Sequence, residues 1–258
     1  MKKAVAFLLL ATSLAACSPT QPAATNAPPQ NAVKGDQKSL FGAEVTTWTK
    51  SDQTSGKLTE VGFTLPFAAV EKAPESGAPT SLQLTFPSNV TSTTFIDHLS
   101  LDYSPSGHEP AGIYDLPHFD MHFYAMSPEE VKAIDCNNLL TPETDRVPAN
   151  YLFFPPPTGE CVPQMGYHAS DMTSPELNQE KPAKFTKTMI LGYYGGQMTF
   201  VEPMMTREFL MTKQSFKMPI AKPAVVDKKG LFPTSLNVVF DASAQAYQFS
   251  LTDFVTVN

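Results

Sequence analysis

The sequence has few charged side chains and no cluster of basic ones. Charged residues make up 17% of the chain, and 25 acidic residues outnumber 18 basic ones, giving a formal net charge of −7 at pH 7. Binding to nucleic acid requires a basic patch or stripe, and an electrostatic hold on anionic lipid requires a polybasic segment. The charge pattern therefore argues against nucleic acid as a partner and against a polybasic membrane contact.

Signature motifs of several enzyme classes are also missing. The chain contains no GxSxG nucleophile elbow, no Walker phosphate loop, no HExxH zinc motif and no GxGxxG dinucleotide fingerprint. The hydrolases, nucleotide-binding proteins and metalloproteases that depend on these motifs are thereby excluded. No reaction can be named from motifs alone.

Long apolar runs are missing outside the N-terminus, where residues 1–16 have the three parts of a bacterial export signal. Lys2 and Lys3 give a positive start, residues 4–11 form a short apolar run, and small residues follow. This run is too short to cross a bilayer core of about 30 Å, which needs roughly 20 residues. Residues 14–17, Leu-Ala-Ala-Cys, match the lipobox of bacterial lipoproteins. We expect cleavage before Cys17; the alternative is an ordinary secretory signal with an incidental cysteine.

Lipid on Cys17 is the expected membrane anchor. A single acyl chain binds a membrane only marginally, so the two or three chains of a lipoprotein are needed for stable anchoring. Ser18 follows the cysteine, which in Gram-negative bacteria resembles the outer-membrane sorting class and predicts the periplasmic side of that membrane. Residues 17–36 are rich in Pro, Ala, Asn and Gln, so we expect a disordered tether that holds the folded part off the membrane.

Cysteine is scarce, with three in the chain. If Cys17 carries lipid, Cys136 and Cys161 are the pair left for a disulfide in an oxidising compartment. The alternative is a catalytic or metal-binding thiol pair, but the spacing is not CxxC and no basic cluster lies near. We therefore predict a structural disulfide, worth about 3 kcal/mol in the chain-entropy model.

Residues 37–258 are expected to form a single β-rich domain, an antiparallel sandwich or barrel-like fold with a few short helices. The predicted strands are 58–65, 82–86, 95–103, 188–194, 198–202, 236–241 and 247–254. Gly195-Gly196 predicts a tight hairpin. Ser127 followed by Pro and two acids predicts a helix start, with the helix running to about Asp135, and a second helix is expected over residues 206–216. Residues 141–184 are Pro-rich and predict an ordered, functional loop.

All five histidines fall between positions 98 and 168, and the sharpest pattern is Pro-His-Phe-Asp-Met-His-Phe-Tyr at residues 117–124. On a strand, His118, Asp120 and His122 share one face while the hydrophobic residues share the other. Two histidines four apart on a strand are separated by roughly 13 Å, so they reach one ion only by leaning inward or at a bulge. On a helix they would stack and chelate directly; the aromatic residues favour the strand.

Further candidate ligands lie outside this stretch. His108 stands in a Gly-His-Glu-Pro sequence, His168 ends the Pro-rich loop, and Glu202 is an acid on an otherwise apolar strand face. A buried acid of this kind must be paired, protonated or bound to a metal. His98, which alternates with Ser100 and Asp102, is expected to face solvent.

Histidines with carboxylates suit zinc, iron, manganese or copper. Five methionines lie near these candidates in sequence, and they either fill the core or form a soft site that favours copper: Met121, Met165, Met198, Met204 and Met205. A metal site could activate bound water or polarise an oxygen of a small-molecule substrate. The alternative to a metal is a buried hydrogen-bonded network of histidines in a non-catalytic, oligomeric interaction module.

Four stretches resemble an uncharacterised family of secreted or lipid-anchored bacterial proteins, one of which belongs to an extracytoplasmic stress sigma-factor regulon. The stretches are residues 107–110, 117–124, 165–168 and 200–204. The resemblance implies a β-rich fold, a cell-envelope setting and ring-like homo-oligomers, and it supplies no activity. Ala169 departs from the family pattern, in which an aromatic residue follows the loop histidine.

Overall fold

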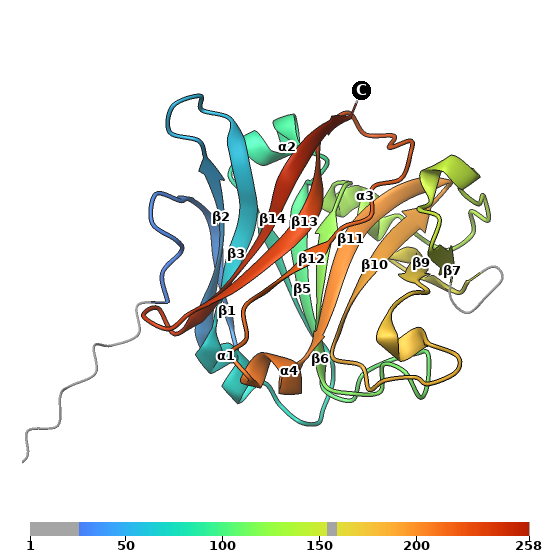
Figure 1. The fold of residues 1–258 in the computed structure, drawn as a ribbon, viewed down its shortest axis with the longest axis horizontal. Helices are drawn as coiled ribbons and strands as arrows, with labels where there is room; N and C mark the ends of the chain where they lie inside the picture. Colours follow the sequence, from blue (N-terminus) through green and yellow to red (C-terminus); the bar gives the residue numbers. More distant parts are fainter. Residues whose placement is uncertain (1–25, 154–158, 258) are drawn as a thin grey trace, which may run out of the picture.

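The protein is a sandwich of two antiparallel sheets in the computed structural model, which describes residues 26–153 and 159–257 (Figure 1). The six-stranded sheet has the order β1 (Val33–Leu40), β2 (Ala43–Ser51), β3 (Leu58–Pro66), β14 (Ala246–Val257), β13 (Gly230–Asp241) and β12 (Phe216–Pro219). The eight-stranded sheet has the order β4 (Thr80–Thr85), β5 (His98–Ser104), β6 (His118–Tyr124), β11 (Gln197–Thr206), β10 (Lys187–Tyr194), β9 (Gly166–Asp171) and β7 (Tyr151–Phe153), with β8 (Cys161–Val162) paired to β9. Both sheets are open in the described chain, so the mainly β prediction is confirmed as a sandwich.

The main hydrophobic core fills the space between the sheets. Phe63 of β3 stacks on Phe249 of β14 at 4.8 Å between ring centroids and also meets Phe123 of β6 at 6.1 Å. All three rings are fully buried. Since Phe123 belongs to the eight-stranded sheet, these contacts join the two layers.

The described helices are short and lie at strand connections. They are α1 (Phe67–Lys72), α2 (Asn89–Thr93), α3 (Pro128–Lys132) and α4 (Arg207–Met211), with 3-10 turns at Thr144–Arg146 and Pro175–Leu177. None of these helices has the length and apolar character needed to cross a membrane.

Local sequence signals account for two of the predicted features. Ser127 and Glu130 form a reciprocal capping box at the start of α3, which satisfies backbone N–H groups that the helix leaves free. Gly195 and Gly196 join β10 to β11 with φ values of 57° and 79°, as a two-residue turn with positive φ at both positions requires.

Several predicted boundaries differ from the structure. The helix that begins after Ser127 ends at Lys132 and does not reach Asp135. The second helix was expected over residues 206–216, but α4 ends at Met211 and Phe216 already begins β12. Lys213 has a φ of 58°, a left-handed conformation that stops a helix. The tether was expected to reach residue 36, whereas β1 begins at Val33. The predicted signal 1–16 and the lipidated Cys17 lie outside the described residues.

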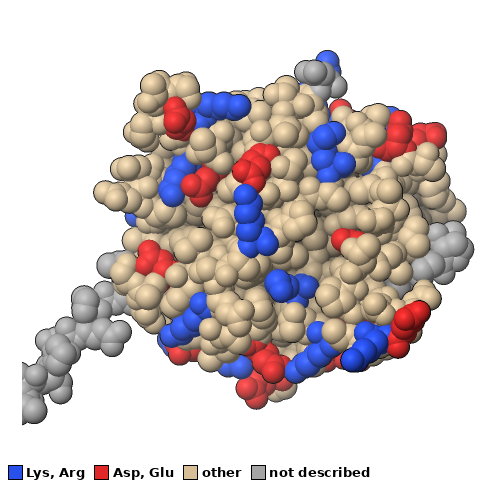
Figure 2. All heavy atoms as spheres, viewed as in Figure 1, with Lys and Arg blue, Asp and Glu red and all other residues tan. Residues whose placement is uncertain are grey.

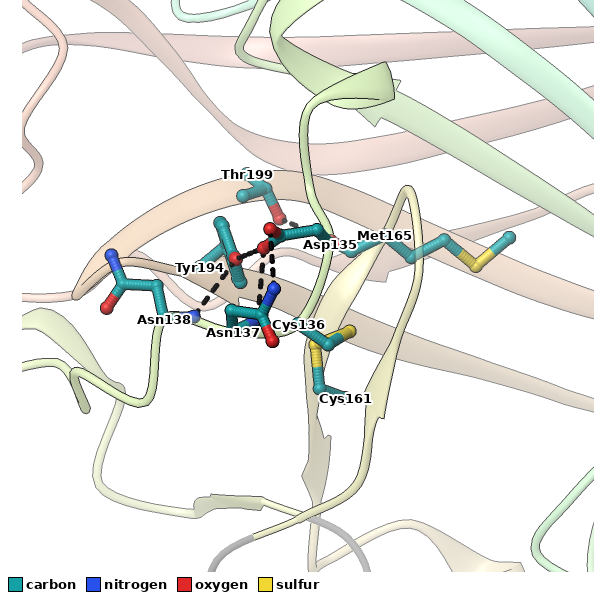
Figure 3. The surroundings of a disulfide bond; sticks show 8 residues. All are labelled: Asp135, Cys136, Asn137, Asn138, Cys161, Met165, Tyr194 and Thr199. Atoms are coloured by element: carbon teal, nitrogen blue, oxygen red, sulfur yellow. Dashed lines mark hydrogen bonds between the residues drawn. A yellow bond between two sulfur atoms is a disulfide. The ribbon is translucent and has the colours of Figure 1, made fainter.

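The predicted disulfide between Cys136 and Cys161 is present (Figure 3) and joins the segment that follows α3 to β8. Asp135 accepts a hydrogen bond from the Tyr194 hydroxyl at 2.7 Å and another from the backbone N–H of Asn137 at 3.0 Å, which fixes the chain on both sides of Cys136. The backbone N–H of Gln164 donates to the carbonyl of Ile134 at 2.9 Å. These contacts hold the chain in place just before β9. The segment 141–184, predicted as one loop, contains the short strands β7, β8 and β9, and its residues 154–158 lie outside the described residues.

Basic and acidic side chains are interspersed over the face shown in Figure 2, without a large area of one sign among the described residues. This distribution agrees with the absence of a basic cluster in the sequence.

Candidate metal centre

Strand β6 carries the core on one side and the candidate site on the other. Phe119, Met121 and Phe123 belong to the main core, while His118 and His122 alternate with them and face away from it. The strand prediction for this motif is therefore confirmed, and the helical alternative is wrong. All seven residues of β6 are buried, so the outer face of the sheet is covered at this strand as well.

Two small apolar clusters provide this cover. One contains Tyr114, Phe185, Ile190 and Met204, and the other contains Tyr124, Val131 and Phe200 with Met165 packed against it. The covering residues outside the sheet come from the connection between β5 and β6, from the segment that follows β6, and from the chain before β10. Polar side chains on the outer face are thereby removed from water.

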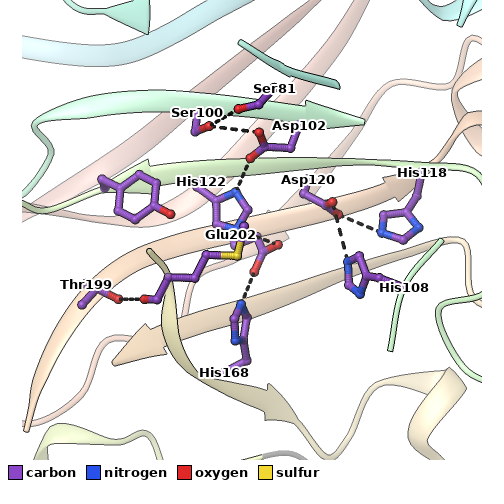
Figure 4. A network of polar contacts seen from close by, with 12 residues as sticks. Ser81, Ser100, Asp102, His108, His118, Asp120, His122, His168, Thr199 and Glu202 are labelled. Atoms are coloured by element: carbon purple, nitrogen blue, oxygen red, sulfur yellow. Dashed lines mark hydrogen bonds and ion pairs between the residues drawn. The ribbon is translucent and has the colours of Figure 1, made fainter. Parts of the chain in front are cut away.

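The first group of possible ligands contains His122, His168 and Glu202, from β6, β9 and β11 (Figure 4). Nε2 of His122 lies 3.2 Å from one carboxylate oxygen of Glu202, and Nε2 of His168 lies 4.0 Å from the other. The side chains of His122 and Glu202 are each 2% exposed. One nitrogen or oxygen from each of the three residues lies within 4.8 Å of the others.

The second group contains His108, His118 and Asp120. Nε2 of His118 lies 3.0 Å from Oδ1 of Asp120, and Nε2 of His108 lies 3.6 Å from Oδ2. His118 and Asp120 are on β6, whereas His108 belongs to the connection between β5 and β6 and its side chain is 42% exposed. Both groups thus consist of two histidines and one carboxylate, and both lie on the outer face of the same sheet.

The six residues predicted as ligands all lie in these two groups, but their division was not foreseen. The sequence suggested one ion held by His118 and His122, whereas the structure puts these histidines in different groups. The reason is the extended geometry of β6, which separates side chains four residues apart by roughly 13 Å along the strand.

The Nδ1 atom of each histidine on β6 or on the preceding connection is held by an acceptor outside its group. Nδ1 lies 2.6 Å from the carbonyl of Leu116 in His118 and 2.7 Å from the carbonyl of Glu109 in His108. In His122, Nδ1 lies 2.9 Å from Oδ2 of Asp102. Since a carbonyl or a carboxylate can only accept, Nδ1 carries the proton in each ring and a neutral ring presents the Nε2 lone pair to its group.

Asp102 was not predicted to contribute to the site. It precedes the motif on β5 and pairs with Asp120 in the ladder between β5 and β6. The alternation of His98, Ser100 and Asp102 was visible in the sequence, but it was interpreted as a solvent-exposed face.

Several atoms that face the centre of each group lack hydrogen-bond partners among the described residues. They are Nε2 of His118, Oδ1 of Asp120, Nε2 of His122 and Oε2 of Glu202. Nε2 of His118 and Oδ1 of Asp120 are 3.0 Å apart without the alignment of a hydrogen bond. A buried polar atom left unpaired costs about 1–3 kcal/mol. A cation at the centre of each group would interact with the unpaired atoms of that group.

The carboxylates hold a proton on His122. Burial acts to lower the pKa of His122, but the charge of Glu202 and the hydrogen bond to Asp102 keep it well above its usual value. His168 differs, because burial lowers its pKa and the nearby charges do not offset the effect.

The second group has a similar balance. Burial acts to lower the pKa of His108, but the adjacent carboxylate of Asp120 raises it to about 9. Burial acts to raise the pKa of Asp120, but its contacts with His118 and His108 hold that pKa below its usual value. Any divalent ion that enters either group therefore displaces protons.

His98 and the methionines lie outside both groups. The expectation that His98 faces solvent is wrong, because its ring is buried and stacks on Tyr124 at 4.9 Å between centroids. Its Nδ1 lies 3.2 Å from Oδ1 of Asp97. Met121, Met198 and Met205 are part of the main core, and Met204 and Met165 pack in the two outer clusters.

Comparison with known proteins yields one partial match. Residues 54–103 match a family model described as TTHB210-like, hypothetical protein TTHB210. The matched stretch runs through β3, α1, β4, α2 and most of β5, so it includes Asp102 and ends before the six possible ligands. No match was found among curated proteins or among solved structures.

Proposed function

We propose that this protein is a lipid-anchored metal-binding protein of the bacterial cell envelope. The address rests on the export signal and lipobox that end at Cys17. The metal binding rests on the two groups of two histidines and one carboxylate on the outer face of the eight-stranded sheet.

One observation carries the metal proposal: His118 and His122 each hold Nδ1 in a hydrogen bond while their buried Nε2 atoms have no partner among the described residues. In metal sites, a ligating histidine typically donates its other ring N–H to a carboxylate or a backbone carbonyl, which fixes the tautomer. Without a metal, both Nε2 atoms lie close to a carboxylate but make no aligned hydrogen bond with it, which costs stability in a buried site.

Three protein ligands per group leave coordination positions for water or substrate. Two nitrogens and one carboxylate suit zinc, iron or manganese, and neither group contains a sulfur ligand. If a group is catalytic, the ion would lower the pKa of a bound water or polarise an oxygen of a small-molecule substrate.

The test is metal analysis of tag-free protein by mass spectrometry after expression with trace metals and dialysis. We expect up to two ions per chain in the natural sequence, and loss of about one ion in each of Glu202→Gln and Asp120→Asn. His98→Gln is the matched control, because His98 is a buried histidine on the same sheet that belongs to neither group. Metal-free wild-type protein, or unchanged content in a His118→Ala and His122→Ala double variant, would overturn the proposal.

The same measurements address the two alternatives. A metal-free protein that forms a defined oligomer and loses stability on replacement of His122 would favour the interaction module, for which the hydrogen bond from His122 to Asp102 is the supporting observation. Tight Cu(I) binding that weakens on replacement of Met165 or Met204 would favour copper instead.

A further inference from the structure

We infer that the two groups bind metal with different affinities, and that Asp102 makes the group of His122, His168 and Glu202 the tighter one. This inference rests on the proposed metal binding. It assigns to Asp102 the role of a positioning residue that acts on the metal through His122, and it makes the group around Asp120 the more readily exchanged site.

The position of Asp102 is fixed from two sides. Oδ2 lies 2.9 Å from Nδ1 of His122, and Oδ1 accepts a hydrogen bond from the Ser100 hydroxyl at 3.1 Å (Figure 4). The Ser100 hydroxyl in turn lies 3.3 Å from that of Ser81 on β4. The carboxylate therefore orients the imidazole of His122 so that Nε2 faces Glu202.

The acceptors behind the two groups differ in charge. Behind His122 the acceptor is a carboxylate, whereas His118 and His108 donate to the backbone carbonyls of Leu116 and Glu109. A charged acceptor makes a hydrogen bond roughly twice as strong as a neutral one and raises the basicity of the ligating nitrogen.

The net charge of the metal-bound site also favours tighter binding in the group of His122, His168 and Glu202. A divalent ion in the first group would be balanced by two carboxylates, those of Glu202 and Asp102. In the second group, Asp120 is the one carboxylate of the described residues in contact with the ligating histidines. A net charge in a buried site is costly. The first group therefore forms the more neutral complex.

Exposure adds a second difference between the groups. His108 is 42% exposed and lies in a connection between strands, whereas His122 and Glu202 are each 2% exposed and lie on strands of one sheet. A ligand supplied by a loop is held less precisely than one on a strand. Because His108 is exposed, water can also compete with it for the metal. His108 is thus the ligand most easily released.

The test is a titration of chelator-treated, tag-free protein with zinc in competition with a chromogenic chelator. We expect two binding steps in the natural sequence. Asp102→Asn keeps a hydrogen-bond acceptor but removes the charge, and it is expected to weaken the tighter step by about 10–100-fold while leaving the weaker one unchanged. His108→Ala is expected to abolish the weaker step and to preserve the tighter one.

The matched control is Asp97→Asn. Asp97 makes the same type of contact with Nδ1 of His98, at 3.2 Å, outside both groups. It should change neither step. Cobalt substitution adds a spectroscopic readout, because the visible absorption of bound Co²⁺ should shift in Asp102→Asn and not in Asp97→Asn.

The outcomes separate this inference from the proposed function. Failure of the natural protein to bind zinc overturns both. Two binding steps of equal affinity would overturn the inference and leave metal binding in place. The same holds if Asp102→Asn leaves the affinity of both steps unchanged or weakens both steps equally. If Asp102→Asn does not fold, Ser100→Ala takes its place, since it retains the carboxylate and frees its orientation. In Ser100→Ala, a loss of zinc affinity that is smaller than expected for Asp102→Asn and confined to the tighter step supports the inference. Unchanged zinc affinity in Ser100→Ala overturns it.

Discussion

Glu202 lies across the β6–β11 ladder from His122, with Oε1 and Nε2 3.2 Å apart and both side chains withdrawn from water. The register that pairs Val201 with Phe123 and Met204 with Asp120 brings these two residues opposite each other. In the metal-free protein this contact is an ion pair, because the pKa of His122 is held well above its usual value.

The first prediction concerns the pH dependence of the metal-free protein. The pKa of His122 is raised, and that of His108 is raised to about 9, so the folded state binds more protons than the unfolded state above pH 6.5. This stabilisation is fully present below pH 6.5 and is lost as pH rises through 9. The melting temperature measured with a chelator should therefore fall over that range, and Glu202→Gln should flatten the profile. A melting temperature that rises with pH would contradict the assignment.

The second prediction concerns Gly192, which pairs with both Phe200 and His168 in the sheet. A Cβ at this position would lie 2.2 Å from the Phe200 ring, and that ring packs on His122 at 4.8 Å and on His168 at 5.4 Å. Gly192→Ala should cost about 1–3 kcal/mol of unfolding free energy and weaken zinc binding at this group. Adding Phe200→Leu to Gly192→Ala should restore part of the free energy of unfolding and part of the zinc affinity. If neither is restored, the steric explanation is wrong.

The third prediction tests the inner face of β6. Phe123 is fully buried and contacts Phe63 and Phe86, each at 6.1 Å between centroids. Phe123→Ala should lower the free energy of unfolding by about 3–5 kcal/mol, measured by urea denaturation. Leu139→Ala is the control, because this leucine is 74% exposed and its truncation should change stability by less than about 0.5 kcal/mol.

The fourth prediction concerns the disulfide. The sequence separation of 25 residues between Cys136 and Cys161 gives about 3 kcal/mol of stabilisation in the chain-entropy model. Reduction with dithiothreitol, or the Cys136→Ser and Cys161→Ser double variant, should lower the melting temperature. A reductant should have no further effect on that variant. A double variant as stable as the natural protein would show that the loop is held by its hydrogen bonds alone.

The fifth prediction concerns Cys17. In a bacterial host, Cys17→Ser should prevent labelling with radioactive palmitate and move the protein from the membrane fraction to the soluble or unprocessed fraction. The natural sequence serves as the positive control. Membrane association that survives the substitution would rule out lipid on Cys17 as the sole anchor.

The sequence predicted those features that depend on local patterns. Alternation on β6 identified the face that carries His118, Asp120 and His122, and the two glycines identified the hairpin between β10 and β11. The capping sequence at Ser127 identified the start of α3. In each of these cases neighbouring residues determine the backbone conformation, so no knowledge of distant contacts was required.

The features that sequence reasoning missed depend on the order of the strands in the sheet and on the segments that bury the outer face of that sheet. Which histidines share an ion follows from the neighbours of β6 in the sheet, and strand order cannot be obtained from alternation. Asp102 and His98 were interpreted as solvent-facing because nothing in β5 itself shows that other segments bury its outer face. The helix expected over residues 206–216 failed for a similar reason, since pairing of β12 with β13 overrides helix propensity there.

The ligands of the tighter group come from β6, β9 and β11, so an ion bound there would tie together strands that are distant in sequence. Because the unfolded chain does not present these ligands together, the ion would stabilise the folded state by mass action. The folded fraction, and with it resistance to proteases, would then rise and fall with the supply of metal around the protein. Cellular abundance of the protein would in this way follow the metal without any dedicated sensor.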